Sequence, residues 1–98
     1  MSGARGKALT VAIEQAKELI SKREWLRQRL TELEHRYGMS TPEFLARWSS
    51  GELPEPEDPD MLSDFLRWEA LAGELREVEE ELGRMLAGTM RAGNEGRG

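Results

Sequence analysis

The chain has 98 residues, of which 34% are charged and 6% aromatic, with a net charge of −5 and no cysteine. A chain of this length makes one small domain of marginal stability. The lack of cysteine excludes disulfides, thiolate nucleophiles and thiolate metal sites. No apolar run approaches the roughly 20 residues of a membrane span, and no signal-peptide pattern opens the chain, so we expect a cytoplasmic protein without a membrane partner.

The charge is divided unevenly along the chain. Residues 1–37 carry eight Lys or Arg and five Glu, a net charge of +3, whereas residues 38–98 carry six Arg and fourteen Asp or Glu, a net charge of −8. The two halves should attract each other in a hairpin. An acidic chain argues against direct nucleic-acid binding, because phosphates are bound by clustered Lys and Arg. It favours a basic protein partner, or serves only to keep the protein soluble.

A long helix is predicted over residues 9–37, after a flexible tail at 1–8. Its apolar residues recur every three or four positions, as on one face of a helix. They are Leu9, Ala12, Ile13, Ala16, Leu19, Ile20, Leu26, Leu30, Leu33 and Tyr37. Gly38 follows at the position where glycine commonly ends a helix.

A short helix is predicted next, over residues 42–48. Ser40 with Glu43 has the pattern of a capping box; alternatively Thr41 is the cap and Pro42 takes the first helical position. The apolar residues of this helix are Phe44, Leu45 and Trp48.

Residues 52–60 contain three prolines and five acidic residues and are predicted to form an extended, solvated connector. Asp58 and Pro59 have the pattern of an N-cap and first helical residue, so a second long helix is predicted over residues 60–87. Gly88 should end it, before a disordered tail at 89–98.

The apolar face of this second long helix is wider at its start than at its end. It consists of Met61, Phe65, Trp68, Leu71, Ala72, Leu75, Val78, Leu82, Met85 and Leu86. Leu62 and Leu66 lie off this face, and the short helix is expected to cover them.

These elements predict an all-α antiparallel hairpin of two long helices with a short helix in the connection. Tyr37 should then lie near Phe65, and Ile13 near Leu86. Two helices touch along one seam, and the apolar stripes are wider than a seam. We therefore expect a homodimer forming a four-helix bundle, or a partner that supplies the missing wall.

Charged residues interrupt both apolar stripes. Arg23 and Arg27 lie in the first and Glu79 in the second; the antiparallel register predicts a structural ion pair between Arg23 and Glu79. The alternative is an anion-binding pocket that resembles those of the small all-helical chorismate mutases. Asp64 also lies on the apolar face, where the hydroxyl of Tyr37 is predicted to bond to it.

No residue pattern predicts catalysis, and we expect no cofactor. Glu32 and His35 have the Glu-x-x-His spacing of di-iron bundles, but both point away from the apolar face, so no metal site is expected. Trp25 lies off the stripe and is predicted to be an anchor for a partner; the alternatives are that a second subunit packs there or that it is simply exposed. The acidic connector is predicted to occupy a basic cleft; the alternative is a solvated loop. The predicted partner-binding residues are Trp25, Trp48, Glu52, Glu55, Glu57, Asp58, Asp60 and Trp68.

One stretch of the chain carries a family resemblance. Its residues are Tyr37-Gly38-Met39-Ser40-x-x-Glu43-Phe44, then Gly51-Glu52-Leu53, an acidic spacer, and Phe65-x-x-Trp68-Glu69-Ala70. This pattern, within residues 30–85, resembles small helical prokaryotic proteins that are the antitoxin-like or uncharacterised member of a two-gene operon. The resemblance implies a protein that binds and neutralises a toxin, although no DNA-binding module accompanies it.

The expected function is thus a non-enzymatic, antitoxin-like interaction module that occludes a basic protein partner. The alternatives are a structural homo-oligomeric bundle and a small helical enzyme that binds an anionic substrate at Arg23 and Arg27.

Overall fold

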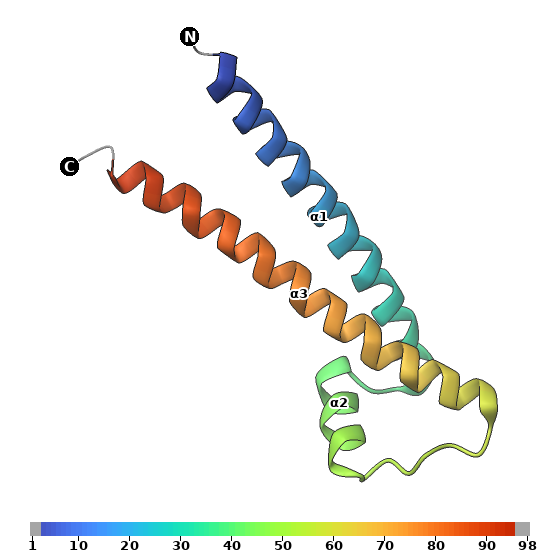
Figure 1. Ribbon diagram of the computed structural model, residues 1–98. Coiled ribbons are helices and arrows are strands. Elements are labelled where there is room, and N and C mark those ends of the chain that lie inside the picture. The colour runs from blue at the N-terminus through green and yellow to red at the C-terminus, as the bar shows by residue number, and fades with distance from the viewer. Residues whose placement is uncertain (1–2, 96–98) are drawn as a thin grey trace.

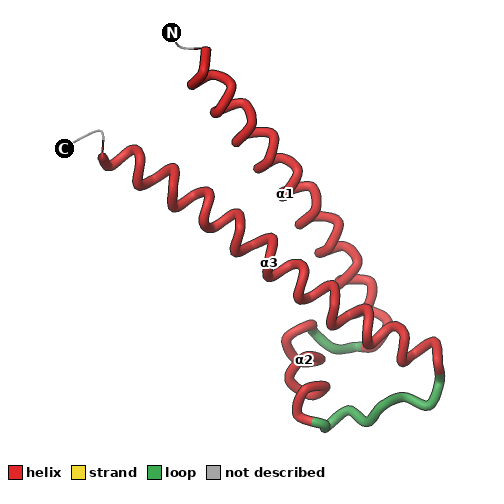
Figure 2. Tube along the Cα trace, viewed as in Figure 1, coloured by secondary structure: helices red, strands yellow, loops and turns green. Residues whose placement is uncertain are grey.

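The computed structural model describes the backbone of residues 3–95 and the side chains of residues 8–88. Helix α1 (Gly3–Tyr37) and helix α3 (Pro59–Glu95) run antiparallel, and the short helix α2 (Thr41–Ser50) packs beside them where they are connected (Figure 1). Within residues 3–95, the segments that connect the helices are loops (Figure 2). The predicted all-α hairpin with a short helix in its connection is confirmed.

Both long helices extend further than the sequence predicted. Helix α1 begins at Gly3 rather than at residue 9, and α3 continues through Gly88 to Glu95. A glycine inside a helix costs only about 1 kcal/mol relative to alanine, so it ends a helix only where the backbone also turns to positive φ. Gly38 and Gly51 make that turn, with φ of 66° and 84°. Residues 1–2 and 96–98 of the predicted tails lie outside the described part of the chain.

The two later helices start at the residues that the sequence indicated as caps. Ser40 is the cap of α2, and its Oγ accepts a hydrogen bond from the backbone N–H of Glu43 at 3.2 Å. Asp58 caps α3, because its Oδ1 accepts from the N–H of Asp60 at 3.0 Å and its carbonyl accepts from Leu62 at 3.0 Å. Each cap satisfies backbone donors that have no partner within their own helix.

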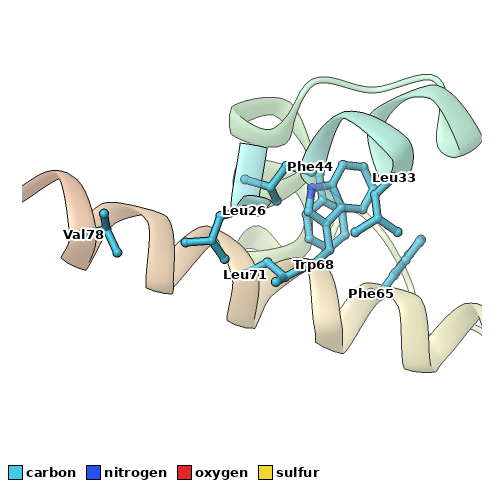
Figure 3. Packing of buried hydrophobic residues seen from close by; sticks show 8 residues of the cluster. Leu26, Leu33, Phe44, Phe65, Trp68, Leu71 and Val78 are labelled. Atoms are coloured by element: carbon cyan, nitrogen blue, oxygen red, sulfur yellow. The ribbon is translucent and has the colours of Figure 1, made fainter. Parts of the chain in front are cut away.

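The hydrophobic core lies in the half of the hairpin nearest the connection, which we call the closed end. Its buried residues are Leu26, Leu30, Leu33, Phe44, Phe65, Trp68, Leu71 and Val78 (Figure 3). Helix α2 contributes Phe44, whose ring stacks on Trp68. The indole Nε1 of Trp68 donates to the hydroxyl of Thr41 at 3.0 Å, so the buried N–H is satisfied.

Helix α2 does not cover the whole apolar arc at the start of α3. Leu62 is half-buried, but Leu66 is 52% exposed, which corrects the expectation that the short helix covers both. The aromatic rings of α2 lie against Phe65 and Trp68 instead. This stacking places α2 over the face of α3 that carries Phe65 and Trp68, so the side of α3 that carries Leu66 stays uncovered.

The other half of the hairpin consists of α1 before Leu26 and α3 after Val78, and we call it the open end. Among its described residues no side chain is buried. Here α1 and α3 diverge toward the two termini (Figure 1). The described part of the chain is elongated, with extents of 63 × 24 × 17 Å.

Candidate protein-interaction surface

A groove of about 840 Å³ runs between the diverging helices at the open end. We call it the open-end groove. Its lining residues are Leu9, Ala12, Ile13, Gln15, Ala16, Ile20 and Arg23 from α1, and Leu82, Met85, Leu86 and Gly88 from α3. Both walls are therefore mainly apolar.

The large side chains of this groove keep much of their surface in solvent. Leu9 is 63% exposed, Ile13 46%, Ile20 42% and Leu86 62%. The register predicted from the sequence places Ile13 near Leu86, and the structure does bring them to one groove. It does not bury them, because two diverging helices cannot close over each other's stripes. Four of the seven exposed large apolar side chains among the described residues thus line one groove.

Arg23 is the only charged residue among the described residues that line the open-end groove. It is half-buried, and its Nε is buried without a hydrogen-bond partner. The predicted ion pair between Arg23 and Glu79 is wrong, because Nη2 of Arg27 lies 3.0 Å from Oε2 of Glu79 instead. The two long helices diverge toward the termini (Figure 1), and Arg27 lies one helical turn nearer the connection than Arg23, where the helices are closer together. Arg23 lines the open-end groove instead.

Three other basic residues of α1, namely Lys22, Arg27 and Arg36, form ion pairs with carboxylates of α3. Lys22 lies 3.9 Å from Glu74, and Arg36 lies 2.8 Å from Asp64. Together with the Arg27–Glu79 pair, they place cation–carboxylate contacts between the helices at several levels. Arg23 differs from them because no hydrogen bond or ion pair to it is found within the described residues.

The predicted hydrogen bond between Tyr37 and Asp64 is confirmed at the closed end. The hydroxyl of Tyr37 donates to Oδ2 of Asp64 at 2.6 Å, and the same oxygen accepts from Arg36 at 2.8 Å. The bond from Tyr37 is the main cause that holds the pKa of Asp64 below its ordinary value, while burial raises the pKa of Tyr37. The sequence analysis missed Arg36, which its helical position places on the outer face. These hydrogen bonds from Arg36 and Tyr37 to Asp64 link the end of α1 to the start of α3.

The three tryptophans differ in their availability for a partner. Trp25 is 49% exposed, with the guanidinium carbon of Arg29 5.3 Å from its ring centroid. Trp48 is half-buried against Phe44. Trp68 is fully buried, so its prediction as an interaction anchor is wrong: it is the centre of the core. The helical spacing of the apolar residues places Trp68 on the apolar face of α3. A residue on that face can belong either to the core or to an interface.

The acidic side chains of the connector are exposed, although Leu53 and Pro56 between them are half-buried. The five acidic residues of the connector are Glu52, Glu55, Glu57, Asp58 and Asp60. Oε2 of Glu52 lies 3.9 Å from Arg47, and the carboxylate of Asp58 is occupied in capping α3. The connector lies at the closed end, away from the open-end groove (Figure 1).

A second groove, of about 670 Å³, lies where α2 meets the two long helices. Arg27 and Arg76 line it, but Arg27 is paired with Glu79, and Nε of Arg76 lies 3.8 Å from Glu80. Glu34 and Glu69 line it as well, so its charge does not favour an anion. The arrangement therefore gives no support to an anion-binding pocket at Arg27.

The predicted exposure of Glu32 and His35 agrees with the structure. Within the described chain no three metal-binding side chains of the His, Cys, Asp or Glu type come together. None of the helices, over the residues described, is long and apolar enough to cross a membrane.

No protein-family model, curated protein or solved structure matches this chain significantly.

Proposed function

We propose that this chain is a protein-interaction module that receives part of a protein partner in its open-end groove. The observation that carries the proposal is the exposure of Leu9, Ile13, Ile20 and Leu86 along the two walls of one groove. Exposed apolar side chains that are gathered in a groove, rather than scattered singly, are typical of an interaction site.

The open-end groove provides a driving force for docking. Complete burial of a Leu or Ile side chain contributes about 1.5–3 kcal/mol, and these four side chains keep roughly half of that surface to bury. The gain would be about 1 kcal/mol for each. Association itself has an entropic cost of several kcal/mol, so the partner must add contacts beyond these four residues. The hydrophobic core of the closed end holds α1 and α3 together, so the groove between their other ends is present without a partner.

The antitoxin-like form of this proposal adds the acidic connector. Its exposed carboxylates would cover a basic site on the partner, and complementary charge would speed the encounter and lose its effect in salt. Because the connector and the open-end groove lie at opposite ends of the hairpin, a partner that met both would have to extend along the molecule, whose long dimension is 63 Å. Trp25 lies on α1 between the two ends and would fall within such a footprint.

A photo-crosslinking amino acid at Ile13 tests the docking site in cells that express the chain. We expect it to capture one protein, which is then purified and titrated calorimetrically against the wild type and Ile13→Lys. The substitution should weaken binding at least tenfold, because it places a charge in an apolar contact. Val11→Lys is the matched control, since Val11 is 55% exposed on the same helix but does not line the groove.

Two outcomes would contradict the proposal. If Ile13→Lys and Val11→Lys bind the purified partner as tightly as the wild type, the partner docks elsewhere. If the crosslinker at Ile13 captures only a second copy of this chain, the structural homo-oligomer replaces the heterologous interaction module.

A further inference from the structure

We infer that the open-end groove accepts an amphipathic helix whose apolar stripe carries one carboxylate, and that this carboxylate pairs with Arg23. The inference rests on the proposed function and specifies the chemistry of the partner.

The charge of Arg23 is unmatched among the described residues. The other described cations of α1 that face α3, namely Lys22, Arg27 and Arg36, each meet a carboxylate of this chain. Among the described residues Arg23 meets none, and its Nε is already buried without an acceptor. An occupant that covered the groove would remove more of this guanidinium from water, which is unfavourable unless the occupant brings an acceptor.

Arg23 also occupies a defined position in the groove. Leu9, Ile13, Ile20 and Arg23 share the wall contributed by α1. They span about 21 Å at 1.5 Å per residue, the length of a helix of about 14 residues. Arg23 is at the inner end of this stretch, because Leu26 in the next turn is completely buried.

The unmatched charge of Arg23 and its place at the inner end of the groove together define the occupant. Its stripe must be apolar where it lies against Leu9 to Ile20 and must present an anion where it reaches Arg23. A carboxylate fits best, because an arginine–carboxylate pair combines opposite charge with two parallel hydrogen bonds. A helix presents side chains three and four residues apart on one face, so a stripe with one Glu or Asp near its end provides this pattern.

Three synthetic peptides of 16 residues test the inference by fluorescence anisotropy. They share one Leu/Ile stripe and differ at a single stripe position near one end, which is Glu, Gln or Lys. We expect the Glu peptide to bind the wild-type chain about tenfold more tightly than the Gln peptide, and the Lys peptide to bind most weakly. The preference for Glu should decrease as salt is added.

Arginine variants identify the group that makes the selection. Arg23→Gln should bind the Glu and Gln peptides equally, whereas Arg23→Lys should retain part of the preference because it keeps the charge. Arg27→Gln is the matched control: Arg27 is one turn away, paired with Glu79 and 54% exposed in its side chain, so its loss should leave the preference unchanged. Circular dichroism of each variant checks that the hairpin is folded.

Each failure has a distinct meaning. Equal affinity of the wild type for the three peptides, or an unchanged preference in Arg23→Gln, would overturn the role of Arg23 and leave the docking groove in place. Binding of none of the peptides, at concentrations where sedimentation shows a monomer, would overturn the helix-binding groove itself. A wild-type dimer that Ile13→Lys dissociates would show that a second copy fills the groove, which also overturns this inference.

Discussion

The ring of Phe44 in α2 stacks face to face on the indole of Trp68 in α3, with centroids 4.0 Å apart and planes inclined by only 1°. Phe65 packs edge-on against Phe44, with centroids 5.1 Å apart at 70°. Such stacked and edge-on pairs add to the free energy gained by burial alone. The short helix is therefore held by an aromatic cluster, and the closed end depends on it.

Phe44→Ala should remove about 3–5 kcal/mol of stability, because a fully buried aromatic side chain leaves a cavity that the surrounding helices cannot fill. Leu45→Ala is the control on the same helix, and should cost less because Leu45 is only half-buried. Urea unfolding followed by circular dichroism measures both. Equal losses for the two variants would contradict a central role for the Phe44–Trp68 stack.

The cluster of Tyr37, Arg36 and Asp64 should make the hairpin sensitive to acid. The pKa of Asp64 is held below its ordinary value of 3.8, first by the hydrogen bond from Tyr37. The stability contributed by the ionised carboxylate is thus complete above that value and is lost as the pH falls through the lowered pKa of the folded state. Tyr37→Phe should cost about 2 kcal/mol at pH 7 and clearly less at pH 2.

The same variant should respond differently in alkali. Burial raises the pKa of Tyr37 above its ordinary value of 10.0, so its contribution is complete below that value and is lost as the pH rises through the raised pKa of the folded state. Tyr37→Phe removes this alkaline loss. Urea midpoints of both proteins from pH 2 to pH 11 measure the two limbs, and parallel curves across the range would contradict the assignment.

Two glycines should respond in opposite directions to alanine. Gly51 ends α2 with φ of 84°, and a Cβ there meets no atom within 4 Å, so Gly51→Ala should cost about 1–2 kcal/mol from backbone strain alone. Gly83 lies within α3 and also has open space around a built Cβ, so Gly83→Ala should stabilise by about 0.5–1 kcal/mol. Thermal unfolding compares them; a gain for Gly51→Ala would refute this account.

The closed and open ends should differ in stability. Leu26→Ala should cost about 2–5 kcal/mol because Leu26 is completely buried, whereas Leu86→Ala should cost less than about 1 kcal/mol because Leu86 is 62% exposed. Hydrogen exchange should likewise be slow in residues 26–33 and fast in residues 9–16. Equal protection of both segments in the isolated chain would mean that the open-end groove is already filled, as in a dimer.

Local patterns predicted much of this fold, because they act within a few residues. The apolar period of 3.6 residues indicated the long helices, while Ser40 and Asp58 marked the starts of α2 and α3. The hydrogen bond between Tyr37 and Asp64 was also predictable, since a short connection determines which residues meet at a hairpin turn. The dimeric four-helix bundle and the antitoxin-like activity stay predictions.

The candidate site was less predictable from the same patterns. Trp25 was placed correctly in solvent, but an apolar stripe does not reveal which of its members a chain buries and which it leaves for a partner. Trp68 and Leu86 lie on the same stripe of α3, yet one is fully buried and the other 62% exposed. Likewise, spacing alone did not distinguish Arg23 from Arg27 as the partner of Glu79.

The sequence by itself determined the helices, their caps and their antiparallel order, because backbone hydrogen bonding and apolar periodicity are short-range. Only the tertiary structure decided where the core ends, because that depends on the path of two helices in space. Helix α2 supplies a third packing element at the closed end alone. From Leu26 toward the termini the two long helices diverge without such an element. That divergence exposes the groove and leaves Arg23 with no carboxylate partner among the described residues.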